Sequence, residues 1–157
     1  MIEACKADLM PQSFATLYTH LVFSTKDRRP LIEPHLKDEL HSYMAVVLQN
    51  MDCHAIIINS MPDHIHILLN LSRTVTVAKA AETVKANSSK WLKTKTNSWL
   101  GWQSGYGAFS VSNSRLGAVS KYIRNQEKHH AKASFKEEFI KFLDENGIDY
   151  DEHYLWD

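Results

Sequence analysis

The sequence predicts an α+β fold of the ferredoxin-like, split-βαβ kind, with two further helices at the C-terminal end. Segments of strand and helix character follow one another in the order β-α-β-β-α-β, which forms an antiparallel sheet with two helices on one face. The two middle strand segments are separated by a short turn, which favours an antiparallel hairpin. The length of 157 residues is that of one compact domain.

The first strand and the first helix lie on either side of a basic turn. Residues 14–24 (FATLYTHLVFS) mix aromatic and β-branched side chains, as strands do, and residues 25–30 (TKDRRP) form the turn. Apolar side chains recur at helical spacing over residues 34–49, and Pro34 suits the first turn of a helix. We therefore expect a strand, a turn and a helix in this order.

The middle of the chain predicts the hairpin and the second helix. Residues 53–59 and 64–71 are rich in isoleucine and leucine and predict two strands, which a tight turn at residues 60–63 joins. Residues 77–99 predict a long helix, for which Thr76 is a suitable N-cap.

A short strand and two helices complete the prediction. Residues 108–112 alternate between apolar and polar side chains and predict the strand. We expect one helix over residues 113–130 and a last helix over residues 134–146, which Gly147 ends as a C′ residue.

We expect one domain over residues 11–147, between two tails. Residues 1–10 precede the first patterned segment, and a disordered tail and an upstream start both remain open there. Residues 148–157 form an acidic and aromatic tail. Cys5 and Cys53 have no CxxC partner, so we expect free thiols rather than a disulfide or a zinc site.

The composition is that of a folded protein without a membrane segment. Hydrophobic residues make up 44% of the chain and charged residues 23%, which argues against disorder. No run of apolar residues is long enough to span a membrane, and the N-terminal segment lacks the features of a signal peptide. We expect a cytoplasmic protein with no membrane partner.

The formal net charge is zero, because 18 Lys and Arg residues balance 18 Asp and Glu residues. These charges are unevenly distributed: residues 137–157 contain eight acidic residues and one basic residue, a net charge of −7. Residues 1–136 contain 17 basic and 10 acidic residues, a net charge of +7. The zero total therefore conceals a basic body that is suited to bind nucleic acid.

Basic residues in two places are candidates for contacts with backbone phosphates. They are Lys26, Arg28 and Arg29 in the first turn, and Lys85, Lys90 and Lys93 in the helix expected over residues 77–99. The candidates for stacking on unpaired bases are Trp91, Trp99, Trp102 and Tyr106. Solvated lysines and buried tryptophans are the structural alternative.

A histidine pair lies on the strand expected over residues 64–71. His64 and His66 are two residues apart, so both imidazoles point to the same face, while Ile65 and Ile67 point toward the core. Two adjacent imidazoles can chelate one divalent cation. The structural alternative is two half-buried histidines with hydrogen-bond partners, and the metal interpretation requires a third ligand.

A tyrosine and a glutamine share one face of the helix expected over residues 113–130. Tyr122 and Gln126 are four residues apart, and Gln126 offers a carbonyl oxygen to a hard cation. Tyr122 offers a phenol that can act as a covalent nucleophile. The alternative is an ordinary amphipathic helix. We expect His129 and His130 at the surface, solvated or in contact with phosphate.

Taken together, these motifs resemble those of the HUH-type single-tyrosine transposases, the insertion-sequence 200/605 family with its REP-associated relatives. The resemblance rests on PDHIHIL at residues 62–68, followed by YIRNQ at residues 122–126. Further matches are YTHLVFSTKDRRPLI, WQSGYGAFSVS and DEHYLW, so the resemblance covers nearly the whole chain.

The resemblance implies a metal-dependent DNA strand transferase with the ferredoxin-like fold. His64 and His66 match the metal-binding histidine pair of the family. Tyr122 matches the nucleophile, and Gln126 matches the third metal ligand. The resemblance also implies a homodimer with composite active sites, in which the tyrosine helix comes from the other protomer and residues 113–117 form a flexible connector.

The implied reaction is the cleavage and rejoining of single-stranded DNA at hairpin-bearing element ends, through a 5′-phosphotyrosine intermediate, in a bacterial or archaeal cell. The implied cofactor is Mg²⁺ or Mn²⁺, because phosphate oxygens favour hard cations. Three alternatives stay open: a domesticated relative that acts on chromosomal palindromic repeats, a non-catalytic module that binds single-stranded nucleic acid, and a metal-dependent hydrolase that uses water. The sequence identifies no general base for Tyr122.

Overall fold

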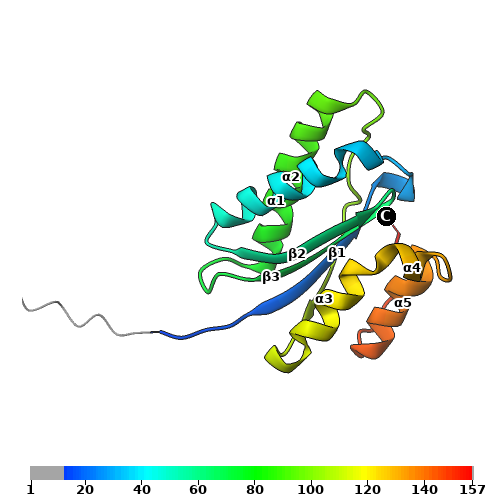
Figure 1. Ribbon diagram of the computed structural model, residues 1–157. Helices are drawn as coiled ribbons and strands as arrows, with labels where there is room; N and C mark the ends of the chain where they lie inside the picture. The colour runs from blue at the N-terminus through cyan, green and yellow to red at the C-terminus, as the bar shows by residue number, and fades with distance from the viewer. Residues whose placement is uncertain (1–12, 157) are drawn as a thin grey trace, which may run out of the picture.

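The computed structural model describes residues 13–156, so the expected tail over residues 1–10, with Cys5, lies outside the described residues. A four-stranded antiparallel sheet forms the centre of the described part of the chain (Figure 1). The strands are β1 (Tyr18–Ser24), β2 (His54–Met61), β3 (His64–Asn70) and β4 (Gly107–Ser110). Their order is β2-β3-β1-β4, with β1 and β3 in the middle, and it confirms the predicted ferredoxin-like fold.

One face of the sheet is covered by α1 (Lys37–Gln49) and α2 (Val77–Lys95), which lie side by side in Figure 1. The side chains of Phe23 and Ile65 on the strands pack with Leu40 of α1 in a single buried cluster. This face follows from the alternation of side chains along β1 and β3. The predicted N-cap of α2 is confirmed, because the Thr76 hydroxyl accepts a hydrogen bond from the Lys79 backbone N–H.

Three helices cover the other face: α3 (Leu116–Arg124), α4 (Gln126–His130) and α5 (Phe135–Glu145) (Figure 1). Phe135 and Phe139 of α5 pack there against Val22 of β1 in a second buried cluster. The sequence predicted two helices on one face of the sheet and did not place the two C-terminal helices. The prediction is therefore incomplete. The C-terminal helices bury the second face of the sheet, which the prediction left uncovered, and this places α3 and α5 over β3.

The helix expected over residues 113–130 is broken at Asn125, which has φ −95° and ψ 23° and leaves the helical conformation. The Asn59 side-chain amide of β2 donates a hydrogen bond of 2.7 Å to the carbonyl of Ile123, which is thereby satisfied outside the helix. As a result Tyr122 and Gln126 lie on two successive helices, α3 and α4, rather than on one.

The other element boundaries differ little from the expected ones. β1 begins at Tyr18, which pairs with the last residue of β3, rather than at residue 14. β2 continues to Met61, so that Pro62 and Asp63 alone connect the hairpin. The predicted C′ residue of α5 is confirmed, since Gly147 has φ 63°. Among the described residues, no helix has the length and apolar character needed to cross a membrane.

Candidate metal and tyrosine site

β3 brings the two predicted histidines to the face that α3 and α5 cover. His64 and His66 are fully buried, and their ring centroids are 5.2 Å apart. Strand alternation places both on the same face, as predicted, while Ile65 and Ile67 point into the first core cluster. The pair therefore lies inside the molecule, between the sheet and the C-terminal helices.

A partner on the far side of each ring fixes the orientation of both histidines. The Nδ1 atom of His64 lies 2.6 Å from Oδ1 of Asp63, in the hairpin turn. The Nδ1 atom of His66 lies 2.8 Å from Nε2 of His20, on the neighbouring strand β1. Because each Nδ1 atom is engaged, the Nε2 atoms are left to face α5. This is the arrangement that orients histidine ligands of metal ions.

A buried carboxylate from α5 faces the two Nε2 atoms. The Oε1 atom of Glu138 lies 3.2 Å from Nε2 of His66, and its Oε2 atom lies 3.8 Å from Nε2 of His64. Among the described residues, both Nε2 atoms and Oε2 of Glu138 are buried and make no hydrogen bond of favourable geometry, although ionic contacts connect them. Unpartnered buried donor and acceptor atoms are costly, and a cation bound between them would satisfy all three.

His130 of α4 completes this group, with its Nε2 atom 2.6 Å from Oε2 of Glu138. One ligand atom each from His64, His66, His130 and Glu138 lies within 4.8 Å of the others, so the group can hold a metal ion. His130 was expected at the surface, solvated or in contact with phosphate. The structure instead places it half-buried in the site. Burial alone would lower the pKa of His130, but Glu138 and Asp63 raise it above its usual value.

The phenol of Tyr122 points at the same carboxylate. Its O–H donates a short hydrogen bond to Oε1 of Glu138, and its ring centroid is 6.0 Å from that of His66. Burial raises the pKa of Tyr122 above its usual value, and Glu138 raises it further. Burial acts in the same direction on the pKa of Glu138, but His130 and His66 outweigh it and hold the pKa below its usual range. In this conformation the phenol is therefore protonated and the carboxylate ionised.

Gln126, the predicted third metal ligand, is buried beside this group. Its Oε1 atom lies 2.8 Å from Nε2 of His130, and its side-chain amide donates to the carbonyl oxygen of Tyr122 at 3.3 Å. The structure therefore brings Gln126 next to the site, with its carbonyl oxygen directed at His130.

Four residues of the site were missed by the sequence analysis: His20, Asp63, His130 and Glu138. Strand pairing provided a signal for His20, because Val22 pairs with His66 and His20 is two residues from Val22 on the same face. Asp63 belongs to the PDHIHIL motif. Glu138 follows an equally acidic neighbour, Glu137, and only the packing of α5 distinguishes the two.

The basic residues proposed for DNA contacts lie in two separate places. Lys26 and Arg29 are exposed in the turn after β1, whereas the Arg28 guanidinium lies 5.1 Å from the ring centroid of Trp156 in the C-terminal tail. Lys90 and Lys93 are exposed on α2, which lies on the opposite side of the sheet from α3 (Figure 1).

Lys85 has a structural role that the sequence did not indicate. Its ammonium group donates to the carbonyl oxygens of Gln103, Ser104 and Gly105 at 2.9, 3.4 and 2.5 Å. Burial lowers its pKa to about 8. The ammonium group of Lys85 thus stabilises the loop before β4. The three carbonyl oxygens accept hydrogen bonds from the N–H donors that a contact with phosphate would require.

The tryptophans considered for base stacking are largely packed. Trp99 is buried and Trp102 is half-buried, and their indole N–H groups donate to Ser89 and Ser88. Trp91 stacks on Tyr43 at a centroid distance of 5.6 Å. Of the four candidates, Tyr106 is the exposed one.

Comparison with known proteins agrees with the resemblance in the sequence. The chain is 24% identical over 114 residues to the ISDra2 transposase TnpA of Deinococcus radiodurans, a match that covers 68% of this chain and 81% of that protein. A solved structure of a putative transposase from the same organism aligns with a TM-score of 0.58 and 22% identity, over 74% of this chain and 98% of that one.

A second solved structure, a REP-associated tyrosine transposase bound to a REP hairpin, aligns with a TM-score of 0.57 and 13% identity. That alignment covers 79% of this chain and 76% of the other. At these identities the two structures show the shared fold. Residues 13–126, well over half of the chain, match the family model of the IS200-like transposases. The chain therefore belongs to the IS200-like transposase family.

Proposed function

We propose that this transposase cleaves and rejoins single-stranded DNA at hairpin-bearing element ends through a covalent link to Tyr122. The observation that carries the proposal is the convergence of the Tyr122 phenol on the buried group formed by His64, His66 and Glu138. Membership of the family supports DNA strand transfer. The REP hairpin bound to a protein of similar fold supports a substrate with a hairpin.

The residues of the site fit a divalent cation, for which we propose Mg²⁺ or Mn²⁺. The fit rests on the Nε2 atoms of His64 and His66, which are buried without a hydrogen bond, and on the Glu138 carboxylate that faces them. These three side chains would hold the ion, and Gln126 is the further ligand predicted from the sequence. When bound, the ion would act as a Lewis acid on the scissile phosphate.

In the proposed reaction the phenolic oxygen of Tyr122 attacks phosphorus. The bond from phosphorus to the 3′ oxygen breaks, which releases a 3′-OH and leaves a 5′-phosphotyrosine. One phosphodiester replaces another, so the bond energy is retained, and attack by a 3′-OH reverses the step and rejoins DNA. Glu138 accepts the phenol hydrogen bond and thus lies where a proton acceptor is needed.

The site has to open before it can act. The Nε2 atoms of His64 and His66 are buried, and α5 lies over both. The raised pKa of Tyr122 and the lowered pKa of Glu138 also keep the phenol protonated while the two groups are in contact. We therefore propose that α5 or α3 shifts when DNA binds.

A covalent-adduct assay tests this function. The protein is incubated with Mn²⁺ and hairpin-bearing single-stranded oligonucleotides, and adducts are separated on a denaturing gel. We expect adducts from the wild type and from Tyr154→Phe, an exposed control. We expect none from Tyr122→Phe, which should still bind DNA. Adducts from Tyr122→Phe would show that the nucleophile is misassigned, and DNA binding without any adduct would favour a non-catalytic binding module.

The proposed homodimer with composite active sites is tested separately. Within one chain the ring centroid of Tyr122 lies 6.0 Å from that of His66, so a site built within single chains is the alternative to a composite one. The test mixes the His64→Ala and Tyr122→Phe proteins. In a composite dimer of the two, one site combines an intact His64 from one protein with an intact Tyr122 from the other, so adducts form. Sites built within single chains form none.

The structure bound to a REP hairpin favours a second candidate, action on chromosomal palindromic repeats by a domesticated transposase. The DNA that flanks the gene separates the two. Element ends around the gene would support a mobile element, and dispersed palindromes without such ends would support the domesticated role.

A further inference from the structure

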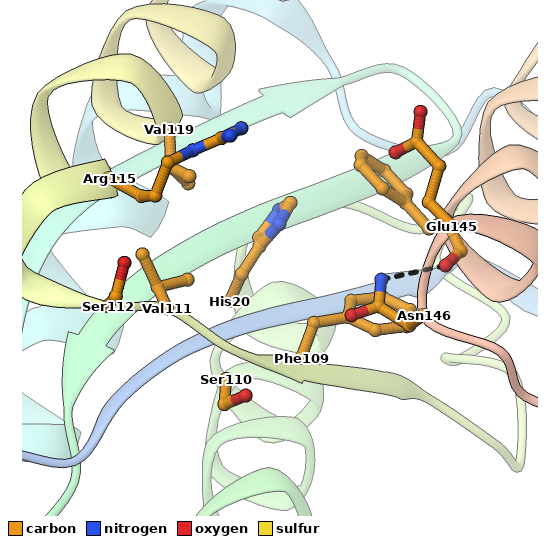
Figure 2. Close-up of a pocket in the computed structure, with 10 residues that line it drawn as sticks. His20, Phe109, Ser110, Val111, Ser112, Arg115, Val119, Glu145 and Asn146 are labelled. Carbon is orange, nitrogen blue, oxygen red and sulfur yellow. Dashed lines mark hydrogen bonds between the residues drawn. The ribbon is translucent and has the colours of Figure 1, made fainter.

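A cleft of about 610 Å³ lies between the beginning of α3 and the end of α5 (Figure 2). His20 and Phe109 of the sheet form its floor, with Val119 and Arg115 on one side and Glu145 and Asn146 on the other. The volume is within the usual range of about 300–1,000 Å³ for sites that bind small molecules.

The cleft leads to the nucleophile. A smaller cavity of about 190 Å³ shares His20, Arg115, Val119, Phe142 and Glu145 with the cleft. This cavity is also lined by Tyr122 and Glu138. The two cavities therefore adjoin, and the smaller one reaches the Tyr122 side chain.

Aromatic rings and a cation give the cleft its chemical character. The rings of Phe109 and Phe142 are 5.5 Å apart, and the His20 ring meets the Phe142 ring edge-on at 5.3 Å. The exposed Arg115 side chain lies at the rim, and among the described residues it forms no ion pair with a carboxylate within 4 Å. Aromatic faces beside a free guanidinium are typical of sites for unpaired nucleotides.

We infer that this cleft binds the unpaired nucleotide next to the phosphate that Tyr122 attacks. The base lies against the aromatic floor, and Arg115 contacts a neighbouring phosphate. The inference rests on the proposed function, because it assumes that DNA reaches Tyr122. It adds a subsite between α3 and α5, and α5 lies beyond residue 126, where the match to the family model ends.

Photocrosslinking locates the base without relying on cleavage. The probe is a pool of hairpin-bearing oligonucleotides with randomised single-stranded flanks that contain 5-iodouracil, bound to the full-length Tyr122→Phe protein. We expect crosslinks on His20, Phe109 or Phe142, identified by mass spectrometry, and their loss in a second protein that also carries Val119→Trp, which fills the cleft. Crosslinks that fall only on α2 or on the turn at residues 26–29 would overturn the inference.

Arg115, just before α3, and Arg124, the last residue of α3, provide a matched pair of variants for measuring DNA binding. Both Arg115 and Arg124 are exposed, but only Arg115 lines the cleft. We expect Arg115→Gln to weaken binding of the pool about tenfold and Arg124→Gln to have little effect. Equal losses would contradict the assigned phosphate contact.

The wild-type adduct assay, run in parallel, separates this inference from the proposed function. Adducts without crosslinks in the cleft overturn the subsite alone. If neither adducts nor crosslinks form, the proposed function fails together with the subsite. Adducts accompanied by crosslinks in the cleft support both.

Discussion

The Nε2 atom of His20 on β1 lies 2.8 Å from the Nδ1 atom of His66 on β3, and the two rings stack with centroids 5.1 Å apart. Burial lowers the pKa of His20 to about 3, so the ring is neutral and has one donor and one acceptor. With Nδ1 of His66 engaged by His20, Nε2 of His66 is directed at Glu138. His20 thus orients a proposed metal ligand without touching the metal position itself.

Replacement of His20 by phenylalanine keeps a ring of similar size and removes the polar partner of His66. We expect the affinity for Mn²⁺ to fall about 10- to 100-fold while the fold is retained, as for other partners of metal ligands. Calorimetric titration with Mn²⁺ measures the affinity. His35→Phe, at an exposed histidine, serves as the control. An unchanged affinity in His20→Phe would show that the contact with His66 does not orient a ligand.

Glu138→Gln tests the carboxylate that α5 contributes. The substitution removes the charge that faces His64 and His66, and we expect the affinity for Mn²⁺ to fall at least about tenfold. Glu137→Gln changes the neighbouring exposed carboxylate and should bind Mn²⁺ as the wild type does. A parallel titration of Gln126→Ala assigns the third ligand: a larger loss there than in Glu138→Gln would favour the glutamine predicted from the sequence.

The pH dependence of stability should depend in part on His41, whose Nε2 atom lies 2.8 Å from the Ser60 hydroxyl. Burial, assisted by Lys37, lowers the pKa of His41 to about 4 in the folded protein. Between this value and the unfolded pKa of about 6.5 the unfolded chain binds more protons, so stability falls as the pH falls through this interval.

We expect His41→Gln to remove about 1–3 kcal/mol of this pH dependence. Urea denaturation of the wild type and the variant at pH 7 and pH 5 measures it. The exposed His35→Gln should retain the slope of the wild type. Parallel slopes in His41→Gln and the wild type would indicate that other groups carry the dependence.

Gly107 of β4 is expected to tolerate no side chain. A Cβ atom at this position would lie 2.6 Å from Cε2 of Phe139, on α5. We expect Gly107→Ala to lower the free energy of unfolding by about 1–3 kcal/mol, because the rings of the second core cluster would have to shift. The control is Gly117→Ala in α3, where no atom lies within 4 Å and where alanine favours the helix. Chemical denaturation of both variants checks the contrast.

The sequence was sufficient to predict the order of the elements and the face on which His64 and His66 lie, because strand alternation is a local property. It did not predict that α3, α4 and α5 bury this face. The apolar side chains of α5, such as Phe135 and Phe139, show that the helix packs against something, but not which surface it covers.

The residues of the proposed site also divide into those that the sequence indicated and those that only the fold brings together. His64, His66 and Tyr122 stand in recognisable motifs, whereas Glu138 reaches them only because α5 folds back over β3. Helical spacing alone predicted that Tyr122 and Gln126 share a helix face. Next to the break at Asn125, the Ile123 carbonyl accepts a hydrogen bond from Asn59, a contact between distant parts of the chain that spacing does not reveal.

The break at Asn125 places Tyr122 and Gln126 on two different helices instead of one turn apart on the same helix. Tyr122 lies in the last turn of α3 and Gln126 begins α4, with Asn125 as the single non-helical residue between the two helices. A rotation about this residue would swing the phenol toward or away from an incoming strand while Gln126 stays beside His130. In the proposed reaction, such a rotation would move the phenol of Tyr122 between cleavage and rejoining while Gln126 keeps its contact with His130.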